Sequence, residues 1–282
     1  MRNLAKTTVA ALAAGALTLG LSGCGEDADS GSDSGGSGAG APLVVAASPV
    51  PHAEILTYVK DNLAQGAGLD LEVKEFTDYV APNTATQDGS VDANYFQNQP
   101  YLDDFNKKNN TTIVPVVTVH LEPLGLYSSS VEDADALESG ATIAIPNDTV
   151  NEARALQLLD ANGIITLKDG VGNEATPGDI AENPGDYTFK ELEAAQLPRS
   201  LEDVDAAVIN GNYALEADLK PAEDALVLES AKDNPYANFL AVKEGNEDDP
   251  RVQKLAKLLA SDEVTTFIEE EYQGSVLPVE AP

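Results

Sequence analysis

Apolar runs and helical patterns alternate along the chain from residue 43 onward. Residues 43–47 (Leu-Val-Val-Ala-Ala) form an uninterrupted apolar run, which predicts a buried strand. Residues 53–63 place apolar side chains four positions apart, which predicts a helix, and residues 70–76 alternate like a second strand. A strand, a helix and a strand joined by short connections are the unit of an open α/β sheet.

The same alternation continues to the end of the chain. A helix is predicted from a capping box formed by Thr149 and Glu152 to a stop at Asn162-Gly163. Further strands are predicted at 113–119, 141–145, 206–209 and 238–242, and closing helices at 251–260 and 263–272. The pattern therefore predicts an α/β protein, with two lobes for a body of this length. Ligands of such sheets bind at the carboxyl ends of strands, so polar residues directly after strands are the candidates for a site.

The first residues have the pattern of an export signal. Arg2 and Lys6 precede an apolar run at 8–21, and Leu21-Ser22-Gly23-Cys24 follows it. This predicts a signal peptide at 1–23 and a lipid-modified Cys24 that anchors the mature protein to the cell membrane, outside the cytoplasm. The alternative is an ordinary signal peptide with an incidental cysteine. Residues 24–41 are Gly, Ser, Asp and Ala with almost nothing to pack, which predicts a flexible tether.

Composition narrows the range of partners. The chain has 48 acidic and 16 basic residues and a net charge of −32, and loss of Arg2 and Lys6 with the signal peptide would make it −34. Nucleic acid is excluded as a partner, because phosphate binding needs clustered Lys and Arg. Cys24 is the only cysteine, so neither a disulfide within one molecule nor a thiolate metal site can form. We expect no metal and no cofactor.

Residues 92–102 (Asp-Ala-Asn-Tyr-Phe-Gln-Asn-Gln-Pro-Tyr-Leu) are unusual in composition. They contain three of the fifteen Tyr and Phe residues of a chain without Trp, together with four side-chain amides. Rings provide apolar walls and amides provide directed hydrogen bonds, which is the composition of a small-ligand pocket. The alternative is a buried turn with core aromatics.

Polar side chains also follow the predicted strands. Arg154 lies on the second turn of the helix after strand 141–145, where it could bind a carboxylate or simply pair with an acidic neighbour. Asn210 and Asn212 follow strand 206–209, and Asn238 begins the next predicted strand. These amides could bind both charged ends of an amino acid, or they could serve as turn and cap residues.

Enzymatic motifs are not apparent. The only histidines are His52, in a proline-bounded loop, and His120, at the end of an apolar strand. The sequence contains no G-x-S-x-G, H-E-x-x-H, P-loop or G-x-G-x-x-G motif. A Ser-His-Asp triad on either histidine stays an alternative, but we expect structural hydrogen bonding for both and no catalytic residues.

Taken together, several stretches resemble the methionine-binding lipoprotein family (NlpA/MetQ type). The resemblance covers about residues 43–280 and includes the signal ending at Cys24. The matching motifs are Pro51-His52-Ala53-Glu54-Ile55-Leu56, Thr77-Asp78-Tyr79-Val80, Pro82-Asn83, Asn94-Tyr95-Phe96-Gln97, Pro100-Tyr101-Leu102, His120-Leu121-Glu122-Pro123-Leu124-Gly125-Leu126-Tyr127-Ser128, Ile145-Pro146-Asn147-Asp148 and Ala153-Arg154-Ala155-Leu156.

The resemblance implies a two-lobed, periplasmic-binding-protein-like (type II) α/β fold with a ligand cleft between the lobes. We expect residues 43–120 and 245–282 to form one lobe and 121–244 the other. The implied function is that of a monomeric, non-enzymatic receptor that captures L- or D-methionine and delivers it to an ABC permease.

The resemblance also assigns roles within the cleft. Tyr79, Phe96 and Tyr101 would surround the thioether, and Arg154 would bind the α-carboxylate. Either Asn210 or Asn212, together with Asn238, would complete the contacts to the ligand backbone.

One position departs from the family pattern. Asn98 stands where the family commonly has His, and an amide is smaller and cannot become cationic. We place Asn98 in the site and keep another small amino acid or a methionine-containing dipeptide as alternative ligands. The alternatives from other classes are an extracellular enzyme and a surface interaction protein whose cleft is vestigial.

Overall fold

The computed structural model describes residues 40–279. The predicted signal peptide (1–23), the lipidation of Cys24 and most of the tether (24–41) lie outside the described residues and stay predictions. Between residues 40 and 279, no helix has the length and apolar character needed to cross a membrane.

The first sheet collects strands from both ends of the described chain. Its members within residues 40–279 are β1 (Leu43–Ala47), β2 (Leu71–Glu75), β3 (Ala93–Asn98), β4 (Ile113–Leu121), β12 (Asn238–Lys243) and β13 (Leu277–Pro278), in the order β13-β4-β12-β3-β1-β2. β1 is parallel to β2 and β3, whereas β12 lies antiparallel between β3 and β4. The accompanying helices are α1 (Glu54–Val59), α2 (Ala81–Asp88), α3 (Gln99–Asn109), α8 (Pro250–Leu259) and α9 (Asp262–Tyr272).

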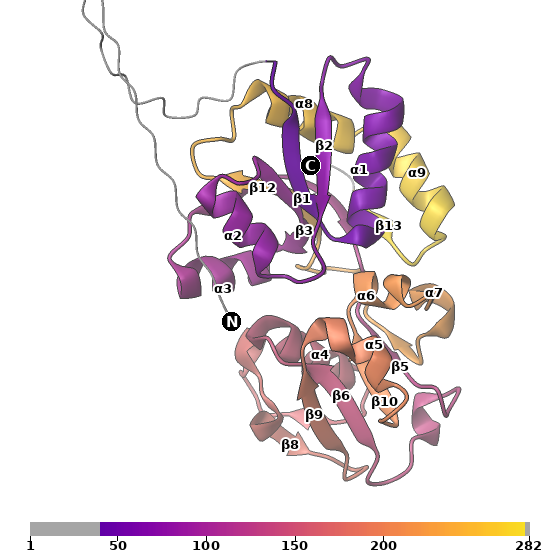
Figure 1. The fold of residues 1–282 in the computed structure, drawn as a ribbon. Helices are drawn as coiled ribbons and strands as arrows, with labels where there is room; N and C mark the ends of the chain where they lie inside the picture. Colours follow the sequence, from indigo (N-terminus) through magenta and orange to yellow (C-terminus); the bar gives the residue numbers. More distant parts are fainter. Residues whose placement is uncertain (1–39, 280–282) are drawn as a thin grey trace, which may run out of the picture. The chain divides into compact units, whose positions relative to one another are not determined.

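The second sheet is built from the middle of the chain. Its described strands are β5 (Gly125–Tyr127), β6 (Thr142–Pro146), β9 (Thr188–Leu192), β10 (Ala206–Ile209) and β11 (Val227–Leu228), in the order β11-β5-β10-β6-β9. β7 (Thr166–Leu167) and β8 (Ile180–Glu182) pair separately. The helices are α4 (Thr149–Ala161), α5 (Leu197–Ser200), α6 (Gly211–Glu216) and α7 (Pro221–Asp224). Figure 1 shows this sheet and α4 set apart from β1–β3.

The chain passes between the sheets twice. It leaves the first sheet after Leu121 and enters the second at Gly125, and it returns between β11 and β12. The predicted lobe boundary at 244/245 placed residues 238–243 with the second lobe, and this was wrong for β12. β12 pairs along its length with β3 at one edge and with β4 at the other, so it is a strand of the first sheet. The other lobe boundaries stay predictions.

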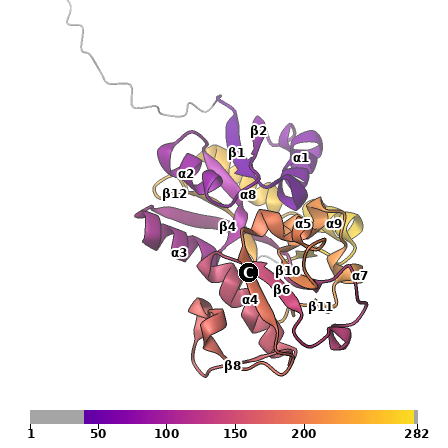
Figure 2. The ribbon, with the colours of Figure 1, turned by 60° about the horizontal axis from the view of Figure 1, so that its bottom comes forward.

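The predicted strands and long helices agree with the structure to within a few residues. Strands 43–47 and 206–209 are confirmed as β1 and β10. The helical pattern at 53–63 corresponds to α1 and the π-helical turn at 60–64, and another π-helical turn at 49–53 precedes them. The N-terminal helix α1 and the C-terminal α9 lie side by side in Figures 1 and 2. Ile55 of α1 and Ile268 of α9 belong to one apolar cluster.

The predicted capping box of α4 was displaced by one residue. Asp148 is the N-cap, because its backbone is still extended while Thr149 is already helical, and its carboxylate accepts from the Asn151 amide nitrogen at 3.0 Å. The predicted stop is confirmed, since α4 ends at Ala161 and Gly163 has a positive φ of 70°.

The aromatic and amide stretch forms a central strand followed by a helix, rather than a turn. All six residues of β3 are buried, including the polar Asn94 and Gln97. Their amides are bonded to α2: Asn83 Nδ2 donates to Gln97 Oε1 at 2.8 Å, and Asn94 Nδ2 donates to Thr86 Oγ1 at 2.7 Å. Because α2 satisfies these amides, β3 can be polar and buried at the same time.

We predict that Leu156→Ala will lower the free energy of unfolding by about 2–5 kcal/mol, because Leu156 is fully buried in the apolar cluster between α4 and the second sheet. Val80→Ala is the control, since Val80 is 58% exposed and should change stability by no more than about 0.5 kcal/mol. Urea unfolding of both variants measures the difference. Equal effects would contradict this core assignment.

Candidate ligand-binding site

A pocket lies where the ends of β3 and β10, the start of α4 and the two crossings between the sheets meet. Its cavity volume is about 30 Å³, well below the usual range for small-ligand sites, about 300–1,000 Å³. The eight residues proposed from the sequence all line it: Tyr79, Phe96, Asn98, Tyr101, Arg154, Asn210, Asn212 and Asn238. Gln97, Glu122, Asn151 and Gly211 also line the pocket and were missed.

Three rings form one wall. The centroids of Tyr79 and Phe96 are 6.1 Å apart, and the Tyr101 ring stands edge-on at 5.8 Å from Tyr79 and 6.1 Å from Phe96. The Tyr101 hydroxyl donates to the Tyr79 carbonyl at 2.8 Å. Burial raises the pKa of Tyr79 and of Tyr101 well above the usual tyrosine range, so both rings stay neutral. This wall suits an apolar, polarisable ligand side chain.

Arg154 brings a buried positive charge to the opposite side. Its Nε and Nη2 donate to the two carboxylate oxygens of Glu229 at 2.8 and 2.5 Å, and Nη2 also donates to the Glu122 carbonyl at 3.0 Å. The guanidinium stacks over the Tyr236 ring at 4.1 Å. Both interpretations of Arg154 therefore apply, because it pairs with an acidic residue and also lines the pocket. These contacts use Nε and Nη2 and leave Nη1 unengaged.

Burial by itself would lower the pKa of Arg154. The hydrogen bonds and charge of Glu229 outweigh burial and raise this pKa overall, so the guanidinium stays charged.

Two amides after β10 present unpaired atoms to the pocket. Asn210 Nδ2 donates to Asn151 Oδ1 at 2.9 Å, and Asn212 Oδ1 accepts from the Tyr79 hydroxyl at 2.5 Å. The other amide atoms, Asn210 Oδ1 and Asn212 Nδ2, are buried without a hydrogen bond of normal geometry to any described residue, although the Asn212 amide lies near enough to the Glu216 carboxylate to act to lower its pKa. One is an acceptor and the other a donor, so the pair can bind a positive and a negative group.

The remaining predicted amides face each other across β3 and β12. Asn98 and Asn238 are partners in the register of the two strands. Asn98 Oδ1 also caps α3 by accepting from the Tyr101 amide nitrogen at 3.1 Å. The residue at the family's His position is thus tied to the helix that carries one of the aromatic rings.

Glu122 is the most informative of the missed residues. It is 6% exposed, follows β4 directly and packs so closely on Gly211 that a Cβ there would lie 2.8 Å from the Glu122 Cβ. Burial acts to raise the pKa of Glu122, but His52 and His120 outweigh it and lower this pKa to about 2. The pocket therefore holds a carboxylate. The rule that polar residues after strands mark the site would have found it.

His52, His120 and Glu122 form the group whose ligand atoms could in principle hold a metal, all lying within 4.8 Å of one another. His120 Nε2 is hydrogen-bonded to Glu122 Oε1, and His52 Nε2 lies 3.1 Å from the same oxygen, so we assign no metal to this group. Within residues 40–279, the polar contacts of the two histidines are with Glu122, Asn238 and Tyr95, and no serine is among them. The histidines thus have the hydrogen-bonding role expected of them, and a Ser-His-Asp triad receives no support.

The chain is similar to proteins of one family. The family model described as NlpA lipoprotein matches residues 43–280. The chain is 42% identical over 241 residues to the methionine-binding lipoprotein MetQ of Bacillus subtilis (strain 168), covering 84% of this chain and 88% of that protein. It is 39% identical over 273 residues to the D-methionine-binding lipoprotein MetQ of Escherichia coli (strain K12), covering 96% and 97%.

Solved structures give the same result for the fold. The structure of a nutrient binding protein from Burkholderia cenocepacia bound to methionine superposes with a TM-score of 0.81 at 46% identity, covering 84% of this chain and 99% of that one. The predicted fold class, a two-lobed periplasmic-binding-protein-like α/β fold, is confirmed by such neighbours.

The start of α4 carries an acidic group that generates a prediction. Burial, then the charges of Glu191 and Asp148, raise the pKa of Glu152 to about 7. The unfolded chain releases this proton near pH 4.5, whereas the folded chain keeps it to about pH 7. Glu152 therefore costs no stability below about pH 4.5, increasingly more as the pH rises to about 7, and a constant amount above that.

We predict that Glu152→Gln will stabilise the protein at about pH 8 by about 1 kcal/mol, a value reduced for solvent screening, or about 2–4 °C in Tm. The gain should vanish near pH 4.5, the ordinary pKa of a glutamate. Thermal unfolding at both pH values measures it. A gain of the same size at both would contradict the assigned pKa.

Proposed function

Because this chain belongs to the family of NlpA lipoproteins, we propose that it is a lipid-anchored receptor outside the cytoplasm that captures methionine and passes it to an ABC permease. The family is one of substrate-binding proteins and not of enzymes. The observation that carries the proposal is the pocket itself, which combines a neutral aromatic wall with one buried guanidinium and one buried carboxylate.

The two buried charges match the two ends of a free amino acid. The α-carboxylate is bound by Arg154 through Nη1, with Asn212 Nδ2 as a second donor. The α-ammonium is bound by Glu122 and by Asn210 Oδ1. Each unpaired atom at the pocket thereby receives a partner of the correct sign, which buried polar groups require.

The aromatic wall selects the side chain. Tyr79, Phe96 and Tyr101 surround a narrow space that offers no charge, and a thioether makes favourable contacts with ring edges at about 5 Å. Methionine therefore fits better than a charged amino acid.

Transport follows from the arrangement of the chain. A lipid on Cys24 and the tether at 24–41 would keep the receptor near the membrane while its two lobes close on the ligand. The closed receptor then docks as a monomer on the permease. Another small amino acid or a methionine-containing dipeptide is the alternative ligand, because Asn98 stands at the family's His position.

We predict that L-methionine or D-methionine will bind residues 40–282 saturably, one ligand per chain, and will be recovered unchanged. Isothermal titration calorimetry with both stereoisomers and with glycyl-methionine measures this and identifies the ligand. Absence of heat with all three, for protein whose circular dichroism shows the expected α/β content, would reject methionine. Binding to a protein partner alone would then favour a surface interaction protein.

We predict that Arg154→Ala will weaken methionine binding by about 2–5 kcal/mol, at least about thirtyfold in Kd, because the ligand carboxylate loses its buried partner. Arg199→Ala is the matched control, since Arg199 is exposed and does not line the pocket. Arg154→Lys keeps a charge beside Glu229 and tests whether the loss reflects unfolding. Unchanged affinity in folded Arg154→Ala protein would reject the site assignment.

A further inference from the structure

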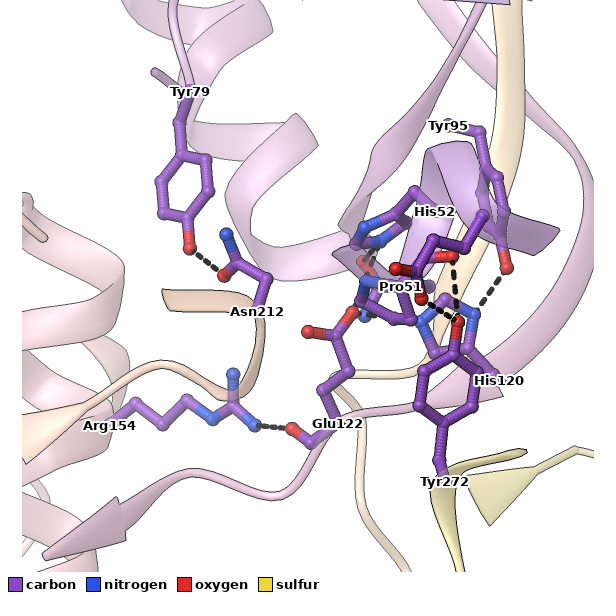
Figure 3. A network of polar contacts seen from close by, with 11 residues as sticks. Pro51, His52, Tyr79, Tyr95, His120, Glu122, Arg154, Asn212 and Tyr272 are labelled. Carbon is purple, nitrogen blue, oxygen red and sulfur yellow. Dashed lines mark hydrogen bonds and ion pairs between the residues drawn. The ribbon is translucent and has the colours of Figure 1, made fainter. Parts of the chain in front are cut away.

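A buried His-Glu-His cluster lies directly behind the pocket. Glu122 Oε1 is 2.8 Å from His120 Nε2 and 3.1 Å from His52 Nε2, and the three residues are at most 6% exposed (Figure 3). One oxygen of the Glu122 carboxylate thus lies close to both histidine rings, and the same side chain lines the pocket. The proposed function uses Glu122 for the ammonium but gives no role to the histidines.

The acceptors around each ring determine where its proton lies. His120 Nε2 donates to Glu122 Oε1 at 2.8 Å. His52 Nε2 donates to Asn238 Oδ1 at 3.4 Å and lies 3.1 Å from Glu122 Oε1. Because these oxygens only accept hydrogen bonds, both Nε2 atoms carry a proton. His120 Nδ1 accepts from the Tyr95 hydroxyl, so both ring nitrogens of His120 have a hydrogen-bond partner. His52 Nδ1 is buried without a partner among the described residues. A second proton there would be an unpaired buried N–H, which is unfavourable.

The cluster therefore keeps a net charge of one negative. Burial lowers the pKa of His120, which also favours its neutral form. Tyr95 stays neutral, because burial raises its pKa well above the usual range. Arg154 faces Glu122 from α4 through the Glu122 carbonyl.

Other charged groups face the cluster from neighbouring elements. Burial, together with the charge of Glu122, raises the pKa of Glu216 of α6. Tyr272 of α9 donates to Glu54 of α1 at 2.8 Å behind the cluster. The acidic neighbours Glu216 and Glu54 disfavour a further negative charge on Glu122. Glu122 therefore depends on the histidines to remain ionised.

The cluster also joins the segments that cross between the sheets. Glu122 lies on the first crossing, directly after β4, which carries His120. Asn238, at the end of the second crossing, accepts from His52 Nε2 through its Oδ1 at 3.4 Å. His52 itself comes from the turn after β1. The carboxylate is thus held in place from the first sheet and from both crossings.

We propose that His52 and His120 are positioning residues that hold Glu122 ionised and aimed at the ligand ammonium. Ligand binding is then insensitive to acid over the pH range in which a buried carboxylate without these donors would take up a proton. This inference rests on the proposed amino-acid site. Without the donors, Glu122 must lose a proton to bind an ammonium, and affinity falls with pH by up to about tenfold per unit.

The first test is calorimetric titration of L-methionine between about pH 5 and about pH 8. Wild type should keep its affinity within about twofold, and Glu122→Gln should be at least about tenfold weaker at every pH. His120→Leu and His52→Leu each remove a donor and should lose affinity progressively toward acid. His120→Gln keeps an amide nitrogen near the Nε2 position and should restore the flat profile.

The control is Tyr272→Phe, which removes a buried hydroxyl of the same region that is bonded to Pro51 and Glu54 and not to Glu122. It should leave the pH profile flat. Equal loss of affinity at all pH values in both leucine variants would overturn the proposal, because the histidines would then only fill space. Acid sensitivity of wild type below about pH 7 would also overturn it.

A second measurement needs no variant. ¹⁵N NMR of histidine-labelled wild-type protein at about pH 8 should show the proton of both rings on Nε2. A proton on either Nδ1, or stoichiometric bound metal at the Nε2 atoms, would overturn the proposal. Failure of wild type to bind any amino acid would reject the proposed function separately, since the ring protonation is measured without ligand.

Discussion

The buried charge of Arg154 is the constraint around which the site is organised. A guanidinium removed from water is costly unless it is paired and hydrogen-bonded, and here Glu229, the Glu122 carbonyl and the Tyr236 ring provide the partners. These partners use one edge of the guanidinium, so its charge is retained at the pocket without being fully neutralised. α4 begins at the pocket, and both crossings between the sheets converge on it.

Glu122 repeats this logic with the opposite sign. Burial of a carboxylate that is 6% exposed would raise its pKa, but the charge of His52 and the hydrogen bond of His120 outweigh burial and keep this pKa low. The pocket therefore presents a fixed cation and a fixed anion. Each of the amides Asn210 and Asn212 already uses one side-chain atom for a hydrogen bond within the protein. Such a site is prepared for a zwitterion before the ligand arrives, which reduces the cost of ordering it.

The aromatic wall and the polar network share one strand. β3 carries Phe96 toward the pocket, while Asn94 and Gln97 are bonded to α2 and Tyr95 to His120. A fully bonded polar network is more directional than an apolar core of the same size, so it can fix the orientation of the ring next to it. The aromatic wall that contacts the ligand side chain and the polar network behind the charged groups thus both depend on β3.

Much of this protein was determined by local sequence. Apolar runs predicted β1, β6 and β10 because a buried strand needs continuous apolar side chains, and the residues that follow strands predicted Arg154, Asn210 and Asn212 as neighbours of one edge. β3 was missed as a strand, because its amides find their partners only on α2.

The tertiary structure alone decided which polar groups are paired. His52 and Glu122 are seventy residues apart, and Arg154 and Glu229 are seventy-five apart, so no pattern of spacing relates them. It also decided that β12 returns to the first sheet, since that depends on which strand edges remain open. Periodicity reports the environment of a residue, whereas the partner of a buried charge is set by segments that meet only when the chain is folded.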